Sequence, residues 1–452
     1  MRRLIHLFPL AALLALAGCS ITSKQMATAQ HQPKRIAIFF DGTNNDEESD
    51  TNVKRLHSLV SLQQRPDIAT FYVEGVGSER GVLGMGTGWG FQDRVKPAYR
   101  FLLENYAPGD RIYIFGFSRG AYSARVLAAL LHRAGLPANT RLSKERLAET
   151  VYDTQKQTLE DNTRAGRFEK LHEALANIEG ATSAPASVSV EVLGLWDTVE
   201  ALGFPEWGDR IQHRLGIDAF EIDVDIPNRR YGDSLCNVKR AYHALSLDDN
   251  REWIFTPLLL GREPMFEGCA WDSKHMLDAK GGIIPGRLKE VWFAGAHSDV
   301  GGGYHDSMLG GVSLNWMLGE LRDTGLLPPG AAVNQDPFGR SHDPESGLYG
   351  LIYRNIHRNI GGYPVNKKQH RTEFARSLCV HPAVLERRRA IPLAAHENHS
   401  LTLRAAGPVC LVEDFGEGIS KPQRLKERPP GSNAACVETL EVEVFGECKG
   451  QQ

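Results

Sequence analysis

The sequence predicts an α/β fold in which a mainly parallel sheet carries helices on both faces, with loops inserted between these elements. Four continuous apolar runs indicate buried strands, at residues 36–40, 112–115, 188–196 and 288–294. Each run ends in polar residues, and open parallel sheets bind ligands at the carboxyl ends of their strands. We therefore expect the functional site among the residues that follow these runs.

The start of the chain resembles the signal peptide of a bacterial lipoprotein. Positive charge at Arg2 and Arg3 precedes an apolar segment, residues 4–16, that is too short to span a membrane comfortably. The sequence Leu16-Ala-Gly-Cys19 follows, and it resembles a lipobox. We expect residues 1–18 to be removed and the Cys19 thiol to be acylated, which would anchor the chain to lipid. The alternative is an ordinary secretory signal that ends near a cysteine.

The residues after Cys19 predict a location in the bacterial cell envelope. Ser20, rather than an acidic residue, follows the cysteine, and in similar lipoproteins this favours the outer membrane. Residues 19–33 include a polar stretch that reads as a short tether, so the folded part would face the periplasm or the cell surface. The net charge of -3, without a basic stripe, argues against a nucleic-acid partner. The sequence does not predict an oligomeric state.

The chain after the signal peptide has about 430 residues, enough for one large α/β domain with insertions. We place a catalytic domain at residues 34–363, with helices within 142–178 and loops at 75–90 and 203–237. Residues 364–452 lose the strand pattern and predict a C-terminal extension that contains cysteines.

Six cysteines remain once Cys19 is set aside. An even number in an oxidising compartment permits three disulfides, and the four cysteines near the C-terminus are the favoured partners. No two are spaced as Cys-x-x-Cys, so neither a zinc site nor a redox motif is predicted. The six are Cys236, Cys269, Cys379, Cys410, Cys436 and Cys448.

The segment around Ser118 has the residue types of a nucleophile elbow. Gly116-Phe-Ser-Arg-Gly120 lies between the strand run 112–115 and an Ala/Leu-rich helical segment, 121–131. Glycines two positions on either side of the serine allow the strand and the helix to approach closely around a strained turn. The backbone N–H of Arg119 would lie at the helix start, where it can stabilise an oxyanion. Ser118 is therefore the predicted nucleophile.

A serine nucleophile needs a neighbouring base, and His297 is the predicted one. It follows the last apolar run and lies beside a glycine-rich turn. Asp197, also at a strand end, is placed to hold the imidazole in one tautomer. Asp299 is an alternative to Asp197, and the alternatives to His297 are His243, His305 and His357.

Asp41 and Asp299 each follow a predicted strand and precede glycines, a pattern typical of turn formers whose carboxylates accept from nearby backbone N–H groups. Asp41 has a second interpretation. It could orient a loop whose Gly42 or Thr43 N–H completes the oxyanion hole. The glycines at 301–303 lack the Lys-Ser/Thr of a P-loop, so no nucleotide site is predicted.

Four motifs in this order resemble a family of α/β-hydrolase domains that includes the phospholipase effectors of type VI secretion. The resemblance covers residues 34 to about 360, and it implies an α/β-hydrolase fold with Ser118, Asp197 and His297 as the triad. The lipobox departs from this family, because a secreted effector is not normally anchored to its own envelope. The motifs are Phe39-Phe-Asp-Gly-Thr-Asn-Asn45, Gly116-Phe-Ser-Arg-Gly-Ala-Tyr-Ser-Ala-Arg125, Leu195-Trp-Asp-Thr-Val199 and Gly295-Ala-His-Ser-Asp-Val-Gly-Gly-Gly-Tyr304.

The sequence thus predicts a lipid-anchored serine esterase that acts on carboxylic ester bonds, with phospholipid acyl esters of a membrane favoured as substrates. No metal and no organic cofactor is implied. One alternative is a carboxylesterase for small or cell-wall-linked esters. The other is a catalytically silent envelope lipoprotein that keeps the fold as a binding module.

Overall fold

The structure, a computed structural model, describes only part of the chain. Residues 1–18, Cys19 and Thr43 lie outside the described residues, as do most of the predicted loops at 75–90 and 203–237. The described residues are 22–25, 32–42, 50–75, 92–137, 141–158, 164–178, 187–199, 234–251, 255, 257–261, 265–266, 269, 276–278, 282–306, 308–344, 357–358, 377–398, 409–413, 420–424, 436–437 and 441–444.

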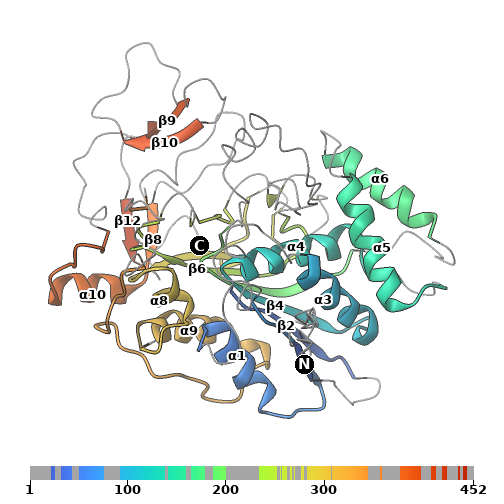
Figure 1. Ribbon diagram of the computed structural model, residues 1–452, viewed down its shortest axis with the longest axis horizontal. Coiled ribbons are helices and arrows are strands. Elements are labelled where there is room, and N and C mark those ends of the chain that lie inside the picture. Colours follow the sequence, from blue (N-terminus) through green and yellow to red (C-terminus); the bar gives the residue numbers. More distant parts are fainter. Residues whose placement is uncertain are drawn as a thin grey trace, which may run out of the picture.

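A nine-stranded sheet forms the centre of the described part, in the order β1-β3-β2-β4-β5-β6-β7-β8-β12 (Figure 1). All neighbouring strands from β3 to β12 pair in parallel, and β1 pairs antiparallel with β3 at one edge. The mainly parallel sheet is therefore as predicted. The strands are β1 Thr22–Gln25, β2 Arg35–Phe40, β3 Ile68–Val73, β4 Arg111–Phe117, β5 Val190–Trp196, β6 Ala241–Ser246, β7 Leu288–Phe293, β8 Ser377–Val380 and β12 Glu441–Val444.

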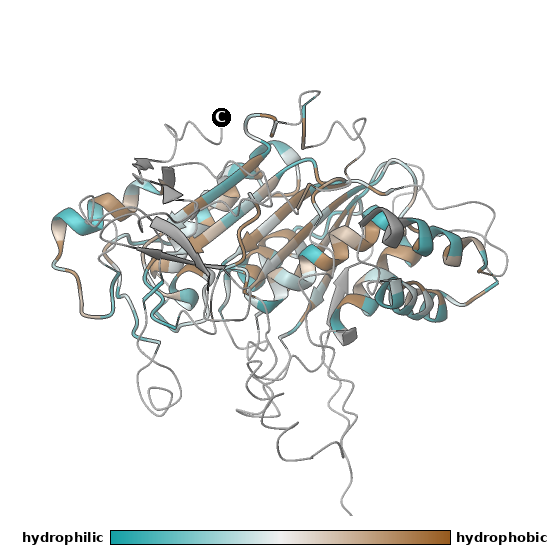
Figure 2. Cartoon of the chain, turned by 90° about the horizontal axis from the view of Figure 1, so that it is seen from above, coloured by the Kyte–Doolittle hydropathy of each residue, from teal (hydrophilic) through white to brown (hydrophobic). Residues whose placement is uncertain are grey.

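Helices cover both faces of the sheet because both faces of its strands are apolar (Figure 1). In β2, the side chains of Ile36 and Ile38 belong to one buried cluster, and those of Ala37 and Phe39 belong to the other. Figure 2 shows the apolar stretches along the central strands between the more polar flanking helices. The first cluster packs on α3 Gln92–Asn105, α4 Arg119–Arg133, α5 Lys144–Gln157 and α6 Arg164–Ala176, and the second on α1 Asn52–Ser61 and α9 Met308–Glu320.

The predicted C-terminal extension is not separate from this sheet. Its strands β8 and β12 pair in parallel and continue the sheet beyond β7. The predicted boundary at residue 363 therefore falls inside the chain that builds the sheet, and β1 likewise recruits part of the predicted tether. The remaining elements are α8 His297–Gly301, the 3-10 helix Arg322–Thr324, α10 Pro382–Ala390, and a second sheet of β10 Ser420–Arg424, β9 Val409–Glu413 and β11 Cys436–Val437.

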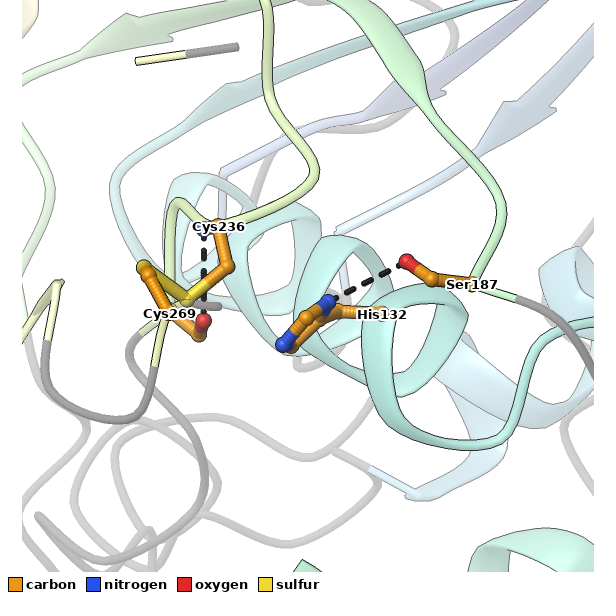
Figure 3. Close-up of a disulfide and its surroundings, with 5 residues drawn as sticks. His132, Ser187, Cys236 and Cys269 are labelled. Atoms are coloured by element: carbon orange, nitrogen blue, oxygen red, sulfur yellow. Dashed lines mark hydrogen bonds between the residues drawn. A yellow bond between two sulfur atoms is a disulfide. The ribbon is translucent and has the colours of Figure 1, made fainter. Parts of the chain in front are cut away.

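A disulfide joins Cys236 and Cys269, which are 33 positions apart (Figure 3). Cys379 is also disulfide-bonded. The sequence favoured pairing among the last four cysteines, whereas the Cys236–Cys269 bond lies before them and beside the sheet. Its two half-cystines tie the segment before β6 to the segment that precedes β7.

Candidate active site

Ser118 lies at the turn between β4 and α4, as a nucleophile elbow requires. Its backbone has φ 58° and ψ −128°, a positive-φ conformation that residues other than glycine rarely adopt. A Cβ on Gly116 would come 2.5 Å from the carbonyl oxygen of Gly120, and a Cβ on Gly120 would come 2.3 Å from that of Asp41. Both glycines are therefore required for the close packing around the turn.

His297 and Asp197 meet beside this elbow. His297 begins α8, directly after β7, and its Nδ1 lies 2.5 Å from Oδ2 of Asp197, which follows β5. The imidazole contacts the rings of Phe117 and Phe255, whose centroids lie 4.7 and 4.8 Å from its own. Since Phe117 immediately precedes Ser118, this packing places the imidazole at the elbow. Of the predicted base and carboxylate, the structure brings together His297 and Asp197.

The other ring nitrogen of His297 is available for chemistry. Nε2 is buried and, among the described residues, has no hydrogen-bond partner. Burial lowers the pKa of His297, and the bond to Asp197 offsets this only in part. The imidazole is therefore neutral near pH 7, with one nitrogen able to accept a proton.

Asp197 has a second partner that sequence reasoning missed. Arg358 donates from Nη1 to Oδ1 at 2.7 Å and from Nη2 to Oδ2 at 2.8 Å. Burial would raise the pKa of Asp197, but Arg358 and His297 outweigh it and hold that pKa well below its usual range. Asp197 is thus a fixed anion. Its backbone has φ 39°, so it is, like Ser118, a residue other than glycine with a positive φ.

Asp249 holds the backbone of His297, and it too was missed. Its Oδ2 accepts from the His297 N–H at 3.1 Å and from Nη2 of Arg251 at 2.6 Å. Burial would raise the pKa of Asp249, but Arg251 and Arg358 lower it to about 2. The start of α8 therefore rests on an ionised carboxylate that follows β6.

Asp41 organises the loop predicted to complete the oxyanion hole. Its carboxylate accepts from the hydroxyls of Thr51 and Tyr72, and its Oδ1 accepts from the Gly42 N–H at 2.7 Å. Arg94 donates to its backbone oxygen. Gly42 is thus bound to Asp41 rather than directed at a substrate, and its oxyanion role stays a prediction. The Arg119 N–H belongs to the first turn of α4, where helix donors lack intrahelical acceptors.

Asp299 does not replace Asp197, because its carboxylate serves the turn of α8. It accepts from the Ala296 N–H at 2.9 Å and lies 2.6 Å from Nδ1 of His342. This agrees with the turn-former interpretation.

The alternative bases have other positions. His243 is buried in β6, where its Nδ1 lies 3.0 Å from Glu290 and its Nε2 accepts from Thr198 N–H at 3.1 Å. His305 is exposed, and His357 is half-buried next to Arg358. None of the described contacts of these histidines involves Ser118 or Asp197.

With this geometry in view, comparison with known proteins identifies the family. A family model described as the catalytic domain of Tle1-like phospholipase effectors of the type VI secretion system (T6SS) matches residues 34–320. The chain belongs to this family. The resemblance predicted from the four motifs is confirmed, and so is the α/β-hydrolase-like fold.

Individual relatives are distant. An uncharacterized protein of Saccharomyces cerevisiae is 25% identical over 408 residues, covering 66% of this chain and 58% of the yeast protein. The chain thus spans little more than half the length of this relative. A structure of an uncharacterized protein from Pseudomonas aeruginosa is 21% identical, covers 70% of this chain and 48% of that one, and gives a TM-score of 0.37.

Two further structures are similar to this chain. A butyrate-bound esterase from Thermogutta terrifontis is 16% identical, covers 69% of this chain and 91% of its own, and gives a TM-score of 0.33. The Tle1 effector bound to the VgrG spike is 19% identical, covers 66% of this chain and 56% of its own, and gives a TM-score of 0.28.

No group of three or more His, Cys, Asp or Glu side chains in the described part of the chain is arranged to hold a metal ion. None of the helices described is both long enough and apolar enough to cross a membrane.

Proposed function

We propose that this protein is a serine hydrolase that cleaves carboxylic ester bonds with Ser118, His297 and Asp197. One observation carries the proposal. His297, which packs on Phe117 beside the strained Ser118, has Nδ1 held by Asp197 and Nε2 without a partner among the described residues. This is the arrangement a general base needs, since one nitrogen is fixed as a donor and the other is left to accept.

The reaction would take two acyl-transfer steps. Nε2 of His297 accepts the hydroxyl proton of Ser118 as Oγ attacks the ester carbonyl carbon, and the protonated imidazole then returns that proton to the leaving alcohol. A water, deprotonated by the same nitrogen, then attacks the acyl carbon; the bond to Ser118 Oγ breaks, the imidazole returns the proton to Oγ, and the carboxylic acid leaves. The Arg119 N–H would stabilise each oxyanion, joined by the N–H of Gly42 or Thr43. For Gly42 this requires its bond to Asp41 to break.

Phospholipid acyl esters are the substrates we favour. The family to which the chain belongs is one of phospholipase effectors. The proposed acylation of Cys19 would hold the hydrolase domain against a membrane of the bacterial cell envelope, the outer membrane by the identity of Ser20. An anchored enzyme meets its lipid substrate at a high local concentration.

The test compares two substrates on the mature protein purified from the membrane fraction, so that an acyl group on Cys19 is retained. Release of free fatty acid from phosphatidylethanolamine vesicles is measured against hydrolysis of nitrophenyl butyrate, with the Ser118→Ala variant as the blank for each. We expect faster turnover of the vesicle lipid, abolished in Ser118→Ala. A preference for the soluble ester would reassign the protein as a small-ester carboxylesterase. Absence of both activities in folded protein would favour a silent binding module.

A further inference from the structure

We infer that Arg358 is a positioning residue of this site, which grips both carboxylate oxygens of Asp197 and thereby fixes the anion that orients His297. The inference rests on the proposed function, because it assigns Arg358 a role in the same proton transfer. Neither the family motifs nor the strand pattern point to this arginine. It lies more than fifty residues after His297, and no predicted strand or helix adjoins it.

Both terminal nitrogens of the Arg358 guanidinium are held by backbone oxygens as well as by Asp197, so the fold fixes their position. Besides the paired bonds to Asp197, its two terminal nitrogens each donate to a backbone oxygen, Nη1 to that of Ser246 at 2.7 Å and Nη2 to that of Phe255 at 2.6 Å. Such a planar fork of donors matches a carboxylate in a way that a lysine cannot.

The backbone of Arg358 is fixed as well. Its N–H donates to the Asp249 carbonyl oxygen at 3.2 Å, and its own carbonyl oxygen accepts from the Asn398 side chain at 2.8 Å. Asp249 is also the residue whose carboxylate holds the His297 N–H. Arg358 is therefore tied to both acidic residues that position the imidazole.

Four charged side chains from three segments surround the imidazole. Asp197 at the end of β5 and Asp249 after β6 are negative, while Arg251 and Arg358 are positive. On α8 itself, the carboxylate of Asp299 is turned to His342. Ser118 and the rings of Phe117 and Phe255 supply no charge.

Because of this balance, the charge of Arg358 affects the pH at which the Asp197–His297 pair takes up a proton. With two anions and two cations near the ring, the Asp197–His297 pair binds a proton less readily than an isolated Asp–His pair would. Removing the Arg358 charge must raise the apparent pKa of the pair, whichever of the two groups carries the proton. The acid limb of activity would then move to higher pH.

Two substitutions separate the charge of Arg358 from its geometry. Arg358→Lys keeps a positive charge but loses the fork, whereas Arg358→Gln keeps a hydrogen-bond donor but loses the charge. The matched control is Arg35→Gln, which breaks another Arg–Asp pair, with Asp67 at 2.5 Å, at the start of β2 and away from the strand ends that carry the site.

The measured quantity is kcat/KM against pH for a nitrophenyl ester, with active enzyme counted by fluorophosphonate titration. For Arg358→Gln we expect the acid limb to move up by about one pH unit or more. Arg358→Lys should keep the wild-type limb but lower kcat at least about tenfold, with KM little changed. Arg35→Gln should change neither.

An unshifted limb in Arg358→Gln, or a wild-type kcat in Arg358→Lys, overturns the inference. If Arg358→Gln does not fold, the kcat of Arg358→Lys decides alone. NMR of histidine-labelled protein gives a readout that needs no activity, with the His297 signal assigned by its loss in His297→Gln. If wild type is inactive but the His297 titration differs between Arg358→Gln and wild type, the role of Arg358 is supported and the proposed hydrolase function is rejected. If wild type is active but the His297 titration is the same in both proteins, only the role of Arg358 is rejected.

Discussion

The carbonyl oxygen of Asp41 lies against the backbone of Gly120, at a distance where a Cβ on the glycine would be only 2.3 Å away. Gly120 is in the first turn after the nucleophile, and Asp41 begins the loop predicted to complete the oxyanion hole. The two sides of the site therefore approach each other at a position without a side chain. A turn built in this way places Ser118 next to the end of β2.

Gly120→Ala should therefore reduce both folding and activity. The new methyl group meets backbone atoms of Phe40 and Asp41, which cannot move aside as a flexible side chain can. We expect a loss of stability of about 2 kcal/mol or more in urea unfolding. The control is Gly319→Ala in α9, where nothing lies within 4 Å of the added Cβ. It should stabilise by about 0.5–1 kcal/mol, and equal effects of the two substitutions would contradict the packing argument.

The positive φ at Ser118 predicts that position 118 lowers the stability of the fold when it carries any side chain, including the serine that the reaction needs. Alanine keeps the Cβ and hence the cost of φ 58°, whereas glycine adopts this conformation freely. Ser118→Gly should therefore unfold at a higher temperature than Ser118→Ala, by the equivalent of about 1 kcal/mol, although neither hydrolyses ester. If the alanine variant proved as stable as the glycine variant, the elbow would not be strained.

Asp41 predicts a pH-dependent contribution to stability. Burial raises its pKa from 3.8 to about 6, in spite of the bonds from Thr51, Tyr72 and Gly42. The folded state thus holds this proton more tightly than the unfolded state, so the contribution is complete below pH 3.8 and is lost as pH rises through about 6. The loss amounts to at most about 3 kcal/mol.

Asp41→Asn tests this without removing the acceptor for Gly42. Its amide cannot titrate, and the hydroxyls of Thr51 and Tyr72 are able to accept from it. As pH rises from 4 to 7, the free energy of unfolding in urea should therefore rise for the variant relative to wild type. Parallel curves for the two proteins across this range would show that Asp41 does not titrate in the folded state.

The Cys236–Cys269 bond should stabilise the fold by closing a long loop. For two cysteines 33 positions apart, loop-closure entropy predicts a contribution of about 3–4 kcal/mol. We expect the Cys236→Ala/Cys269→Ala protein to lose about this much in urea unfolding. Wild type treated with a reductant should be no more stable than this variant, because the reductant also opens the disulfide of Cys379. A double variant as stable as the oxidised protein would show that the Cys236–Cys269 bond does not stabilise the fold.

The sequence predicted the parts of the site that follow apolar runs, since each run ends where a parallel strand delivers its next residue. Ser118, Asp197 and His297 were predicted in this way, and the structure places His297 against Asp197. The strand β6 was not predicted, because His243 and Ser246 interrupt its apolar pattern, although both are buried and hydrogen-bonded. Asp249, which follows β6, was missed for the same reason.

Arg358 was missed for a different reason. It reaches Asp197 from 161 positions further along the chain, so no periodicity or local spacing connects the two residues. A buried arginine looks like an exposed one in the sequence, and only the fold shows which carboxylate it neutralises. The extension of the sheet by β8 and β12 was hidden similarly, because these are strands of four residues each.

Site-specific labelling of the protein with a fluorophosphonate probe tests the central claim most directly. The probe reports a serine made nucleophilic by a base, independently of the natural substrate. Peptide mass spectrometry should find one adduct, on Ser118, and the rate of its formation should fall at least about 10³-fold in His297→Ala but not in His305→Ala. A folded wild-type protein that stays unlabelled, or that carries the adduct on another serine, would contradict the account.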